Sequence, residues 1–377
     1  MTGGAATETA RLALATIGRE PVRGIPTNFI HIMEHAAIER LAGAPPGAYR
    51  KDPHGVYLAM QKEIGACILD QYIPDNPLTM SDQGWEAPKS ATTGVEQVVL
   101  DGMAIDSPEA VVEHLERFVF PRARQAIASF SEDDRVRQIL KNEAGLQEKI
   151  GPSILKSGYG FVTFPGFRYG GYGYANYFMA YALDPDVIEK DFSLQADLSL
   201  LNNQAAARAY REGGLAPLYR LDHDMADSRG TLVDIQSLDR IWLPHFARCL
   251  EPMLKADVRL IWHCDGNLMG MVPRLLDVGI QGFQGFQYEC GMDYEKICRT
   301  KTKAGEELII CAGVSVSRTL PYGTPDDVRR QMAWLVEKGP RTGLFLSVSS
   351  SVTPGVPWDN IMALMEGLRH YRMRGRG

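Results

Sequence analysis

Short apolar runs alternate with amphipathic stretches of helical periodicity through most of the 377-residue chain. The runs are rich in β-branched residues, and a helical pattern follows each of them. The predicted strands are residues 25–30, 65–73, 160–167, 217–224, 258–267, 279–287, 307–315 and 343–351. Apolar strands separated by helices pair in parallel, with both faces of the sheet covered. Seven or eight such units favour an α/β fold of the (β/α)8 TIM-barrel type over an open, doubly wound sheet.

Residues 74–110 interrupt this rhythm with the proline- and glycine-rich stretch PDNPLTMSDQGWEAPKSATTG. We interpret the segment as a lid-like insertion over a barrel mouth, so residues 1–377 are predicted to form a single barrel domain. A second irregular stretch, RYGGYGYANY at 168–177, places tyrosines among glycines. It is either a flexible surface loop or an aromatic wall for a ring-shaped ligand, built from Tyr172, Tyr174 and Tyr177.

Composition narrows the class of protein. Hydrophobic residues make up 45% of the chain, which is enough for a large core. The net charge of -6 and the absence of a dense lysine/arginine cluster argue against nucleic-acid binding. Neither a signal peptide nor an apolar run of about 18 residues is present, and the six cysteines show no paired spacing. These features predict a cytoplasmic protein with reduced thiols. No glycine-rich nucleotide-binding motif follows a predicted strand.

Polar side chains collect where the predicted strands end, which is where TIM barrels carry their active sites. They are Asp70, Asp222, His223, Asp224, His263, Cys264, Asp265, Glu289, Cys290, Cys311, Ser349 and Ser350. In the stretch IWHCDGN, strand alternation sends His263 and Asp265 to one side and Cys264 to the other, behind the barrel. His263 and Asp265 could together bind a metal ion, or the aspartate could orient the imidazole of the histidine. Alternatively, both side chains only form hydrogen bonds to loop amides.

The remaining strand-end groups allow two interpretations each. Asp222 and Asp224 share a face, as paired carboxylates or with one of them capping the next helix. Glu289 either joins the site or caps a helix, and Cys311 lies inside an apolar run, where cysteine most often acts as a small buried hydrophobe. The stretch GTPDDVRR at 323–330 predicts a helix start with a threonine cap and acidic residues near the positive end of the helix dipole.

Three long stretches resemble the last three units of the uroporphyrinogen decarboxylase superfamily. They are RLIWHCDGNLMGMVPRLLDVGIQGFQGFQYECGMDYEKI, AGVSVSRTLPYGTPDDVRRQM and SSSVTPGVPWDNIMALMEGLRHY. DMADSRGTLVDIQSLDRIWLPHF extends the resemblance, which covers roughly residues 215–371. The resemblance implies a (β/α)8 barrel and a homodimer. The superfamily also contains zinc-dependent methyltransferases that move methyl groups to or from corrinoids or thiols.

The decarboxylase branch carries an Arg-x-x-x-Arg motif on its first strand, and the matching positions here are His31 and His35. Histidine is mostly neutral at pH 7, so this chain lacks the charge needed to hold an eight-carboxylate tetrapyrrole. A role in heme biosynthesis is therefore not expected. The resemblance implies further substrate-binding or catalytic positions at Asp70, Ser228, the adjoining Arg229, and Ser350.

The methyltransferase branch carries a His-x-Cys motif and a late cysteine. Here His263 is kept, Asp265 replaces the motif cysteine, and the late position is a serine. The resemblance still allows a zinc site made of His263, Asp265 and Glu289, or one that recruits Cys311, because oxygen and nitrogen ligands also suit zinc.

The leading hypothesis is a methyltransferase or demethylase for a small methylated, aromatic substrate, with a corrinoid supplied by a partner protein. Zinc would lower the pKa of the acceptor, or His263 would protonate the leaving oxygen without a metal. The expected catalytic residues are His263, Asp265, Asp70 and Asp224. The expected substrate contacts are His31, His35, Tyr172, Tyr174, Tyr177, Asp222, Ser228, Arg229 and Ser350. One alternative is a cofactor-free decarboxylase of a smaller carboxylated ring. Another is a corrinoid- or porphyrin-binding carrier, which the many titratable groups disfavour.

Overall fold

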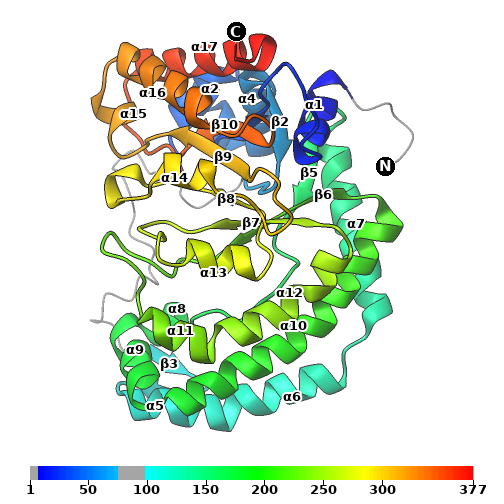
Figure 1. The fold of residues 1–377 in the computed structure, drawn as a ribbon, viewed down its shortest axis with the longest axis vertical. Helices are drawn as coiled ribbons and strands as arrows, with labels where there is room; N and C mark the ends of the chain where they lie inside the picture. The colour runs from blue at the N-terminus through cyan, green and yellow to red at the C-terminus, as the bar shows by residue number, and fades with distance from the viewer. Residues whose placement is uncertain (1–6, 75–97, 377) are drawn as a thin grey trace.

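A computed structural model of the chain describes residues 7–74 and 98–376. Eight parallel strands close into a barrel in the order β1-β10-β9-β8-β7-β6-β5-β2, with helices around it (Figure 1). The strands are β1 (Thr27–Asn28), β2 (Ala66–Leu69), β5 (Leu155–Gly158), β6 (Ala216–Asp222), β7 (Arg259–His263), β8 (Gly282–Gln284), β9 (Ile309–Val314) and β10 (Leu344–Val348). The predicted (β/α)8 barrel is confirmed.

One predicted strand is wrong. Residues 160–167 form an irregular segment, and the barrel strand is β5, which precedes it. Lys156 in the middle of β5 hides the strand from an apolar pattern. Its ammonium group is nevertheless buried, because its Nζ lies 2.9 Å from Oε2 of the equally buried Glu143. The other predicted runs all overlap a barrel strand.

The helices cover the outside of the barrel and vary widely in length. They are α1 (Glu8–Ile17), α2 (His35–Leu41), α3 (Ala48–Lys51), α4 (Pro53–Ile64), α5 (Pro108–His114), α6 (Phe120–Ala128), α7 (Glu132–Ile150), α8 (Tyr169–Tyr172), α9 (Tyr174–Leu183), α10 (Pro185–Gly213), α11 (Ile235–Ile241), α12 (Leu243–Lys255), α13 (Val272–Asp277), α14 (Tyr294–Arg299), α15 (Thr319–Tyr322), α16 (Pro325–Lys338) and α17 (Trp358–Arg374). Helix α16 begins with the expected cap, since Thr324 and Asp327 form a capping box. Within the described part of the chain, no helix is both long and apolar enough to cross a membrane.

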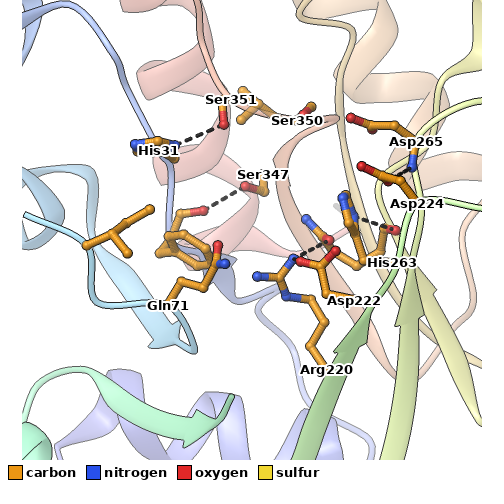
Figure 2. Close-up of a pocket in the computed structure, with 14 residues that line it drawn as sticks. His31, Gln71, Arg220, Asp222, Asp224, His263, Asp265, Ser347, Ser350 and Ser351 are labelled. Carbon is orange, nitrogen blue, oxygen red and sulfur yellow. Dashed lines mark hydrogen bonds and ion pairs between the residues drawn. The ribbon is translucent and has the colours of Figure 1, made fainter. Parts of the chain in front are cut away.

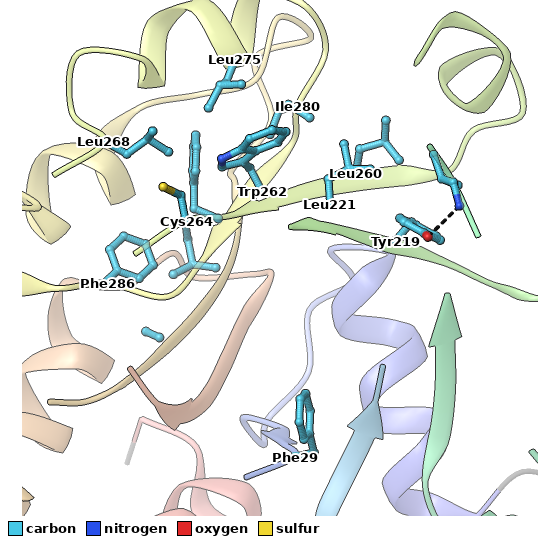
Figure 3. Packing of buried hydrophobic residues seen from close by; sticks show 14 of the residues in the cluster. Phe29, Tyr219, Leu221, Leu260, Trp262, Cys264, Leu268, Leu275, Ile280 and Phe286 are labelled. Atoms are coloured by element: carbon cyan, nitrogen blue, oxygen red, sulfur yellow. Dashed lines mark hydrogen bonds between the residues drawn. The ribbon is translucent and has the colours of Figure 1, made fainter. Parts of the chain in front are cut away.

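Strand β7 shows how alternation sorts side chains between the interior and the outer core. Leu260, Trp262 and Cys264 are buried in the outer core, and Figure 3 shows Trp262 and Cys264 on the side of Leu268 and Leu275. The predicted position of Cys264 behind the barrel is confirmed. His263, one residue earlier, lies on the interior face instead.

The N-terminal end of the barrel interior is filled with apolar side chains. Ala10, Ala13 and Ile17 of α1 form one buried cluster with residues of the strands, including Ile261 and Phe345. Helix α1 packs against β2, β5 and β6 (Figure 1). Because this end is closed, the interior is accessible from the end where the strands terminate.

Most of the predicted lid, residues 75–97, lies outside the described residues. The described remainder begins with an antiparallel hairpin of β3 (Val98–Leu100) and β4 (Met103–Ile105). Its turn residues, Asp101 and Gly102, have φ values of 51° and 78°, as a type I′ turn requires. A π-helical turn, Leu115–Val119, then joins α5 to α6.

The tyrosine-rich stretch is helical, so its interpretation as a surface loop is wrong. It forms α8 and the start of α9, and α9 packs against α5. His114 joins it to the hairpin, with Nδ1 2.8 Å from the Tyr172 hydroxyl and Nε2 3.0 Å from Asp101 Oδ2. The glycines do not serve close packing, because a Cβ at Gly170, Gly171 or Gly173 would meet nothing within 4 Å; Gly173, with a φ of 81°, separates α8 from α9.

Candidate active site

A cavity of about 310 Å³ opens where the barrel strands end (Figure 2). It is lined by predicted site residues from several strands: His31, Asp222, Asp224, His263, Asp265 and Ser350. It is also lined by residues that the sequence did not single out: Phe29, Gln71, Ile73, Arg220, Gln284, Ser347, Val348 and Ser351. The polar groups of distant segments therefore meet in one place, as the barrel fold requires.

Three of these side chains form a cluster that can hold a metal ion. Asp222 lies directly opposite His263 in the register of β6 and β7, and Asp224 follows two residues later. One ligand atom from each residue lies within 4.8 Å of the others. Two carboxylate oxygens and one imidazole nitrogen are a donor set that suits zinc and related divalent ions.

The surroundings of His263 determine which of its nitrogens faces a ligand. Nδ1 lies 3.2 Å from the backbone oxygen of Gln284. A carbonyl oxygen only accepts, so Nδ1 donates the hydrogen and Nε2 keeps the lone pair that a metal needs. Gly285 makes this position possible, because a Cβ there would lie 2.5 Å from Nδ1.

Asp265 lies beside this cluster rather than within it. Its backbone N–H donates to Oδ1 of Asp224 at 3.0 Å and so orients that carboxylate. Its own Oδ1 is buried and has no hydrogen-bond partner in the described part of the chain. Burial raises the pKa of the Asp265 carboxyl, against the opposing effect of His263.

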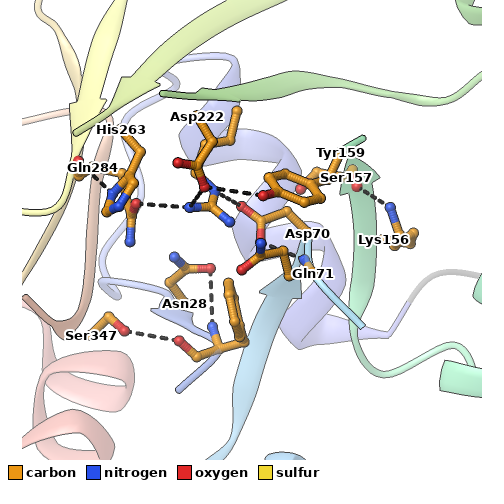
Figure 4. Close-up of polar contacts among 12 residues, drawn as sticks. Asn28, Asp70, Gln71, Lys156, Ser157, Tyr159, Asp222, His263, Gln284 and Ser347 are labelled. Carbon is orange, nitrogen blue, oxygen red and sulfur yellow. Dashed lines mark hydrogen bonds and ion pairs between the residues drawn. The ribbon is translucent and has the colours of Figure 1, made fainter. Parts of the chain in front are cut away.

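Arg220 is the main site residue that the sequence analysis missed. It lies on β6 two residues before Asp222, so both side chains enter the barrel (Figure 2). Figure 4 shows Asp222 close to Asp70 and Tyr159, which also contact Arg220. Its Nη1 donates to Asp222 Oδ2 at 3.0 Å and to Gln284 Oε1 at 3.3 Å, and its guanidinium lies 4.6 Å from the ring centre of Tyr159. An arginine inside the apolar run PLYRLD was the available signal, because a buried arginine needs charged partners.

Asp70 is the principal charged partner of Arg220. Its Oδ2 accepts from Arg220 Nε at 2.7 Å, and its Oδ1 accepts from the backbone N–H of Gln71 at 2.5 Å. Asp70 is buried and does not line the cavity. The structure therefore places this predicted catalytic residue where it positions Arg220.

The two histidines at the positions of the Arg-x-x-x-Arg motif lie in different surroundings. His31 lines the cavity, and its Nδ1 lies 2.9 Å from the hydroxyl of Ser351. Burial lowers the pKa of His31 to about 4, so its imidazole is neutral at pH 7. His35 begins α2, away from the cavity lining, and its ring lies 4.6 Å from that of Tyr49.

The predicted aromatic wall does not reach this cavity. Tyr172 and Tyr177 are buried in the core between helices, and Tyr174 is 50% exposed. Their neighbour Tyr169 comes nearest to the cluster, since its hydroxyl donates to the backbone oxygen of Asp224 at 3.0 Å. Helical spacing directs the rings of Tyr172 and Tyr177 into the core, which the glycine-rich sequence did not indicate.

Four other predicted residues also lie off the cavity lining. Ser228 and Arg229 are exposed after β6, where Arg229 pairs with Asp227. Glu289 is exposed, with its nearest recorded contact at 3.4 Å to Ser315 Oγ, and Cys311 is buried among apolar interior side chains. The structure thus groups His263 with Asp222 and Asp224 rather than with Glu289 and Cys311.

Comparisons with known proteins agree with this architecture. Residues 223–371 match the family model of uroporphyrinogen decarboxylase (URO-D). A methyltransferase from Methanosarcina mazei has a similar structure, with a TM-score of 0.55, 16% sequence identity, and coverage of 96% of this chain and 98% of that chain. At this identity the likeness shows a shared fold. A search of curated proteins gives no significant match. The family match covers the C-terminal part of the chain, and the similarity of fold extends over nearly all of it.

Proposed function

We propose that this protein is a metal-dependent methyltransferase or demethylase that acts on a small methylated substrate. The proposal rests on one observation: Asp222, Asp224 and His263 converge at the cavity that opens where the barrel strands end. The tautomer of His263 supports it, since Nε2 keeps its lone pair. The family match of residues 223–371 and a fold similar to that of a methyltransferase make methyl transfer the favoured reaction.

In this proposal the chain provides an oriented set of ligands. Asp222, Asp224 and His263 hold zinc or a similar divalent ion, which supplies Lewis-acid stabilisation of the oxygen or sulfur that loses or accepts the methyl group. Arg220 and the Tyr159 hydroxyl, 3.1 Å from Asp222 Oδ2, fix that carboxylate. The backbone N–H of Asp265 fixes Asp224. These outer contacts reduce the cost of ordering the ligands when the ion binds.

The size and lining of the cavity support a small substrate. About 310 Å³ lies at the lower end of the range for ligand pockets. Phe29 supplies one aromatic surface for a ring, whereas the tyrosines of α8 and α9 lie elsewhere. A corrinoid bound to a partner protein remains the proposed methyl carrier, and a homodimer the proposed assembly.

Cofactor-free decarboxylation of a carboxylated ring is the second candidate. The buried cation Arg220 at the cavity floor favours it, because such a group can hold a substrate carboxylate. The carrier hypothesis is weaker, since a carrier has no need for this many titratable groups around a small cavity.

Metal analysis tests the proposal. Purified wild-type protein is expected to contain about one zinc or similar ion per chain, whereas His263→Ala and Asp224→Asn are expected to lose it while keeping their circular dichroism spectrum. Glu289→Gln is the matched control, because this exposed carboxylate lies outside the cluster and its loss should leave the metal bound. Wild-type protein that is fully active without metal would exclude metal dependence and favour decarboxylation.

A further inference from the structure

One donor of Arg220 is left unused by the protein. The side chain is only 4% exposed, and its Nε and Nη1 bond to Asp70, Asp222 and Gln284. Nη2 is shielded from solvent and has no hydrogen-bond partner in the described part of the chain. Figure 2 shows the guanidinium directed into the space between Gln71 and Asp222.

Buried guanidinium donors are normally satisfied, and a carboxylate oxygen is their strongest common partner. The cavity has two unlike sides. Asp222, Asp224 and Asp265 lie on one side with His263, and Figure 2 shows Gln71 across from them. The uncharged residues Phe29 and Val348 also line the cavity. A monoanion that reaches Nη2 over these neutral residues shares the guanidinium with Asp70 and Asp222, which are already paired with it, and approaches from the side away from Asp224 and Asp265.

We propose that Arg220 is a specificity-determining residue that binds a carboxylate of the substrate through Nη2, so that the substrate is a small carboxylic acid. Asp70 is the positioning residue, because it holds Nε and thereby fixes the plane of the guanidinium. The methylated heteroatom of the same molecule then lies towards Asp222, Asp224 and His263. Only this last point rests on the proposed function. A phosphate dianion is disfavoured, because it would meet stronger repulsion from the three nearby aspartates.

Calorimetric titration of the full chain with benzoate and with benzamide, in buffer containing zinc, tests the inference. The two probes have nearly the same shape, but only benzoate is an anion. Wild-type protein is expected to bind benzoate at least about tenfold more tightly than benzamide, as a charge-assisted hydrogen bond to a buried donor implies. Arg220→Gln is expected to abolish this preference. Arg229→Gln, at an arginine whose side chain is 89% exposed, is the matched control and should keep it.

A second variant, Arg220→Lys, keeps the test decisive if Arg220→Gln fails to fold. Lysine retains a charge for Asp70 and Asp222 but lacks the fork that extends to Nη2, so the preference should fall severalfold in a folded protein. Equal binding of both probes by the wild type would overturn the inference. An unchanged preference for benzoate in either Arg220 variant would also overturn it, because the ion would then be the carboxylate's partner.

Zinc content measured on the same preparations separates the two proposals. A preference for benzoate that depends on Arg220, in protein that binds no zinc, refutes the metal-dependent function and supports the inference. Bound zinc without such a preference refutes the inference and leaves the metal site standing.

Discussion

At the scale of single residues, close contacts decide the chemistry of the site. The hydrogen bond from His263 Nδ1 to the backbone oxygen of Gln284 orients the imidazole. The ring fits there only because residue 285 is a glycine. Arg220 and Asp222 also depend on each other, since the ion pair holds the buried guanidinium and the half-buried carboxylate in place. Neighbouring groups that are not themselves ligands therefore control whether the cluster can bind an ion.

Gly285→Ala is predicted to weaken metal binding about 10–100-fold, since the new Cβ would displace the ring of His263. Competition titration with a chromophoric zinc chelator measures the affinity. Gly43→Ala is the matched control, because Gly43 also has a positive φ of 65° but nothing within 4 Å of a new Cβ. It carries the same backbone strain and should keep full affinity. Equal loss in both variants would show that strain, not the position of His263, sets the affinity.

The burial of His31 is predicted to make the folded protein less stable as the pH decreases. Its pKa of about 4 in the folded protein lies below the usual 6.5, so the unfolded chain binds the extra proton. The contribution is complete above pH 6.5 and is lost as the pH falls towards 4. At pH 5 the loss amounts to about 2 kcal/mol.

Urea unfolding at pH 7.5 and pH 5, with a chelator present, measures this effect. His31→Gln should lose about 2 kcal/mol less between the two pH values than wild type does. His370→Gln replaces an exposed histidine and should behave like wild type. If His31→Gln shows the same pH dependence as wild type, the buried imidazole is not its source.

At the scale of elements, the two ends of the barrel have separate tasks. Helix α1 closes the N-terminal end with apolar side chains, whereas the C-terminal ends of the strands and the segments that follow them line the polar cavity. Stability and binding can therefore be altered independently.

Ile17→Ala tests this separation. Ile17 is fully buried against the interior cluster, so the variant should lose about 2–5 kcal/mol of unfolding free energy. Its affinity for zinc and for benzoate should stay at the wild-type value, because both sites lie at the other end. Arg11→Ala, on the exposed face of the same helix, should change neither quantity. A weaker zinc site in Ile17→Ala would show that the two ends are coupled.

At the scale of the whole molecule, we expect the barrel core to form without help from an ion. The apolar clusters include residues from nearly every barrel strand, and the proposed ligands lie at the rim. A metal should therefore add stability to a protein that is already folded.

Zinc at one hundred times its dissociation constant is predicted to add about 2.7 kcal/mol of stability, which corresponds to a Tm increase of a few degrees. A chelator should reverse the increase and leave the circular dichroism spectrum unchanged. Asp224→Asn should show a much smaller response to zinc. Unfolding on chelation would contradict the prediction, as would an unchanged response in the variant.

Local sequence pattern alone determined the fold class of this protein and the placement of several side chains. The apolar runs predicted the barrel, because strands covered on both faces have a continuous apolar sequence. Alternation along IWHCDGN placed Cys264 outside and His263 inside, and capping chemistry predicted the start of α16. The pattern failed at β5, where a lysine is buried in an ion pair, and in the tyrosine-rich stretch, where two helices form on either side of Gly173.

Only the tertiary structure decided which polar residues meet. Asp70 and Arg220 are 150 residues apart, and Asp224 and the amide of Asp265 are 41 apart, so their pairing depends on barrel closure and strand register. The register of β6 on β7 joined His263 to Asp222, whereas the sequence had joined it to Glu289. Sequence periodicity reports the face on which a side chain lies. Contacts across strands depend on how the whole chain packs, and local patterns carry no information about that.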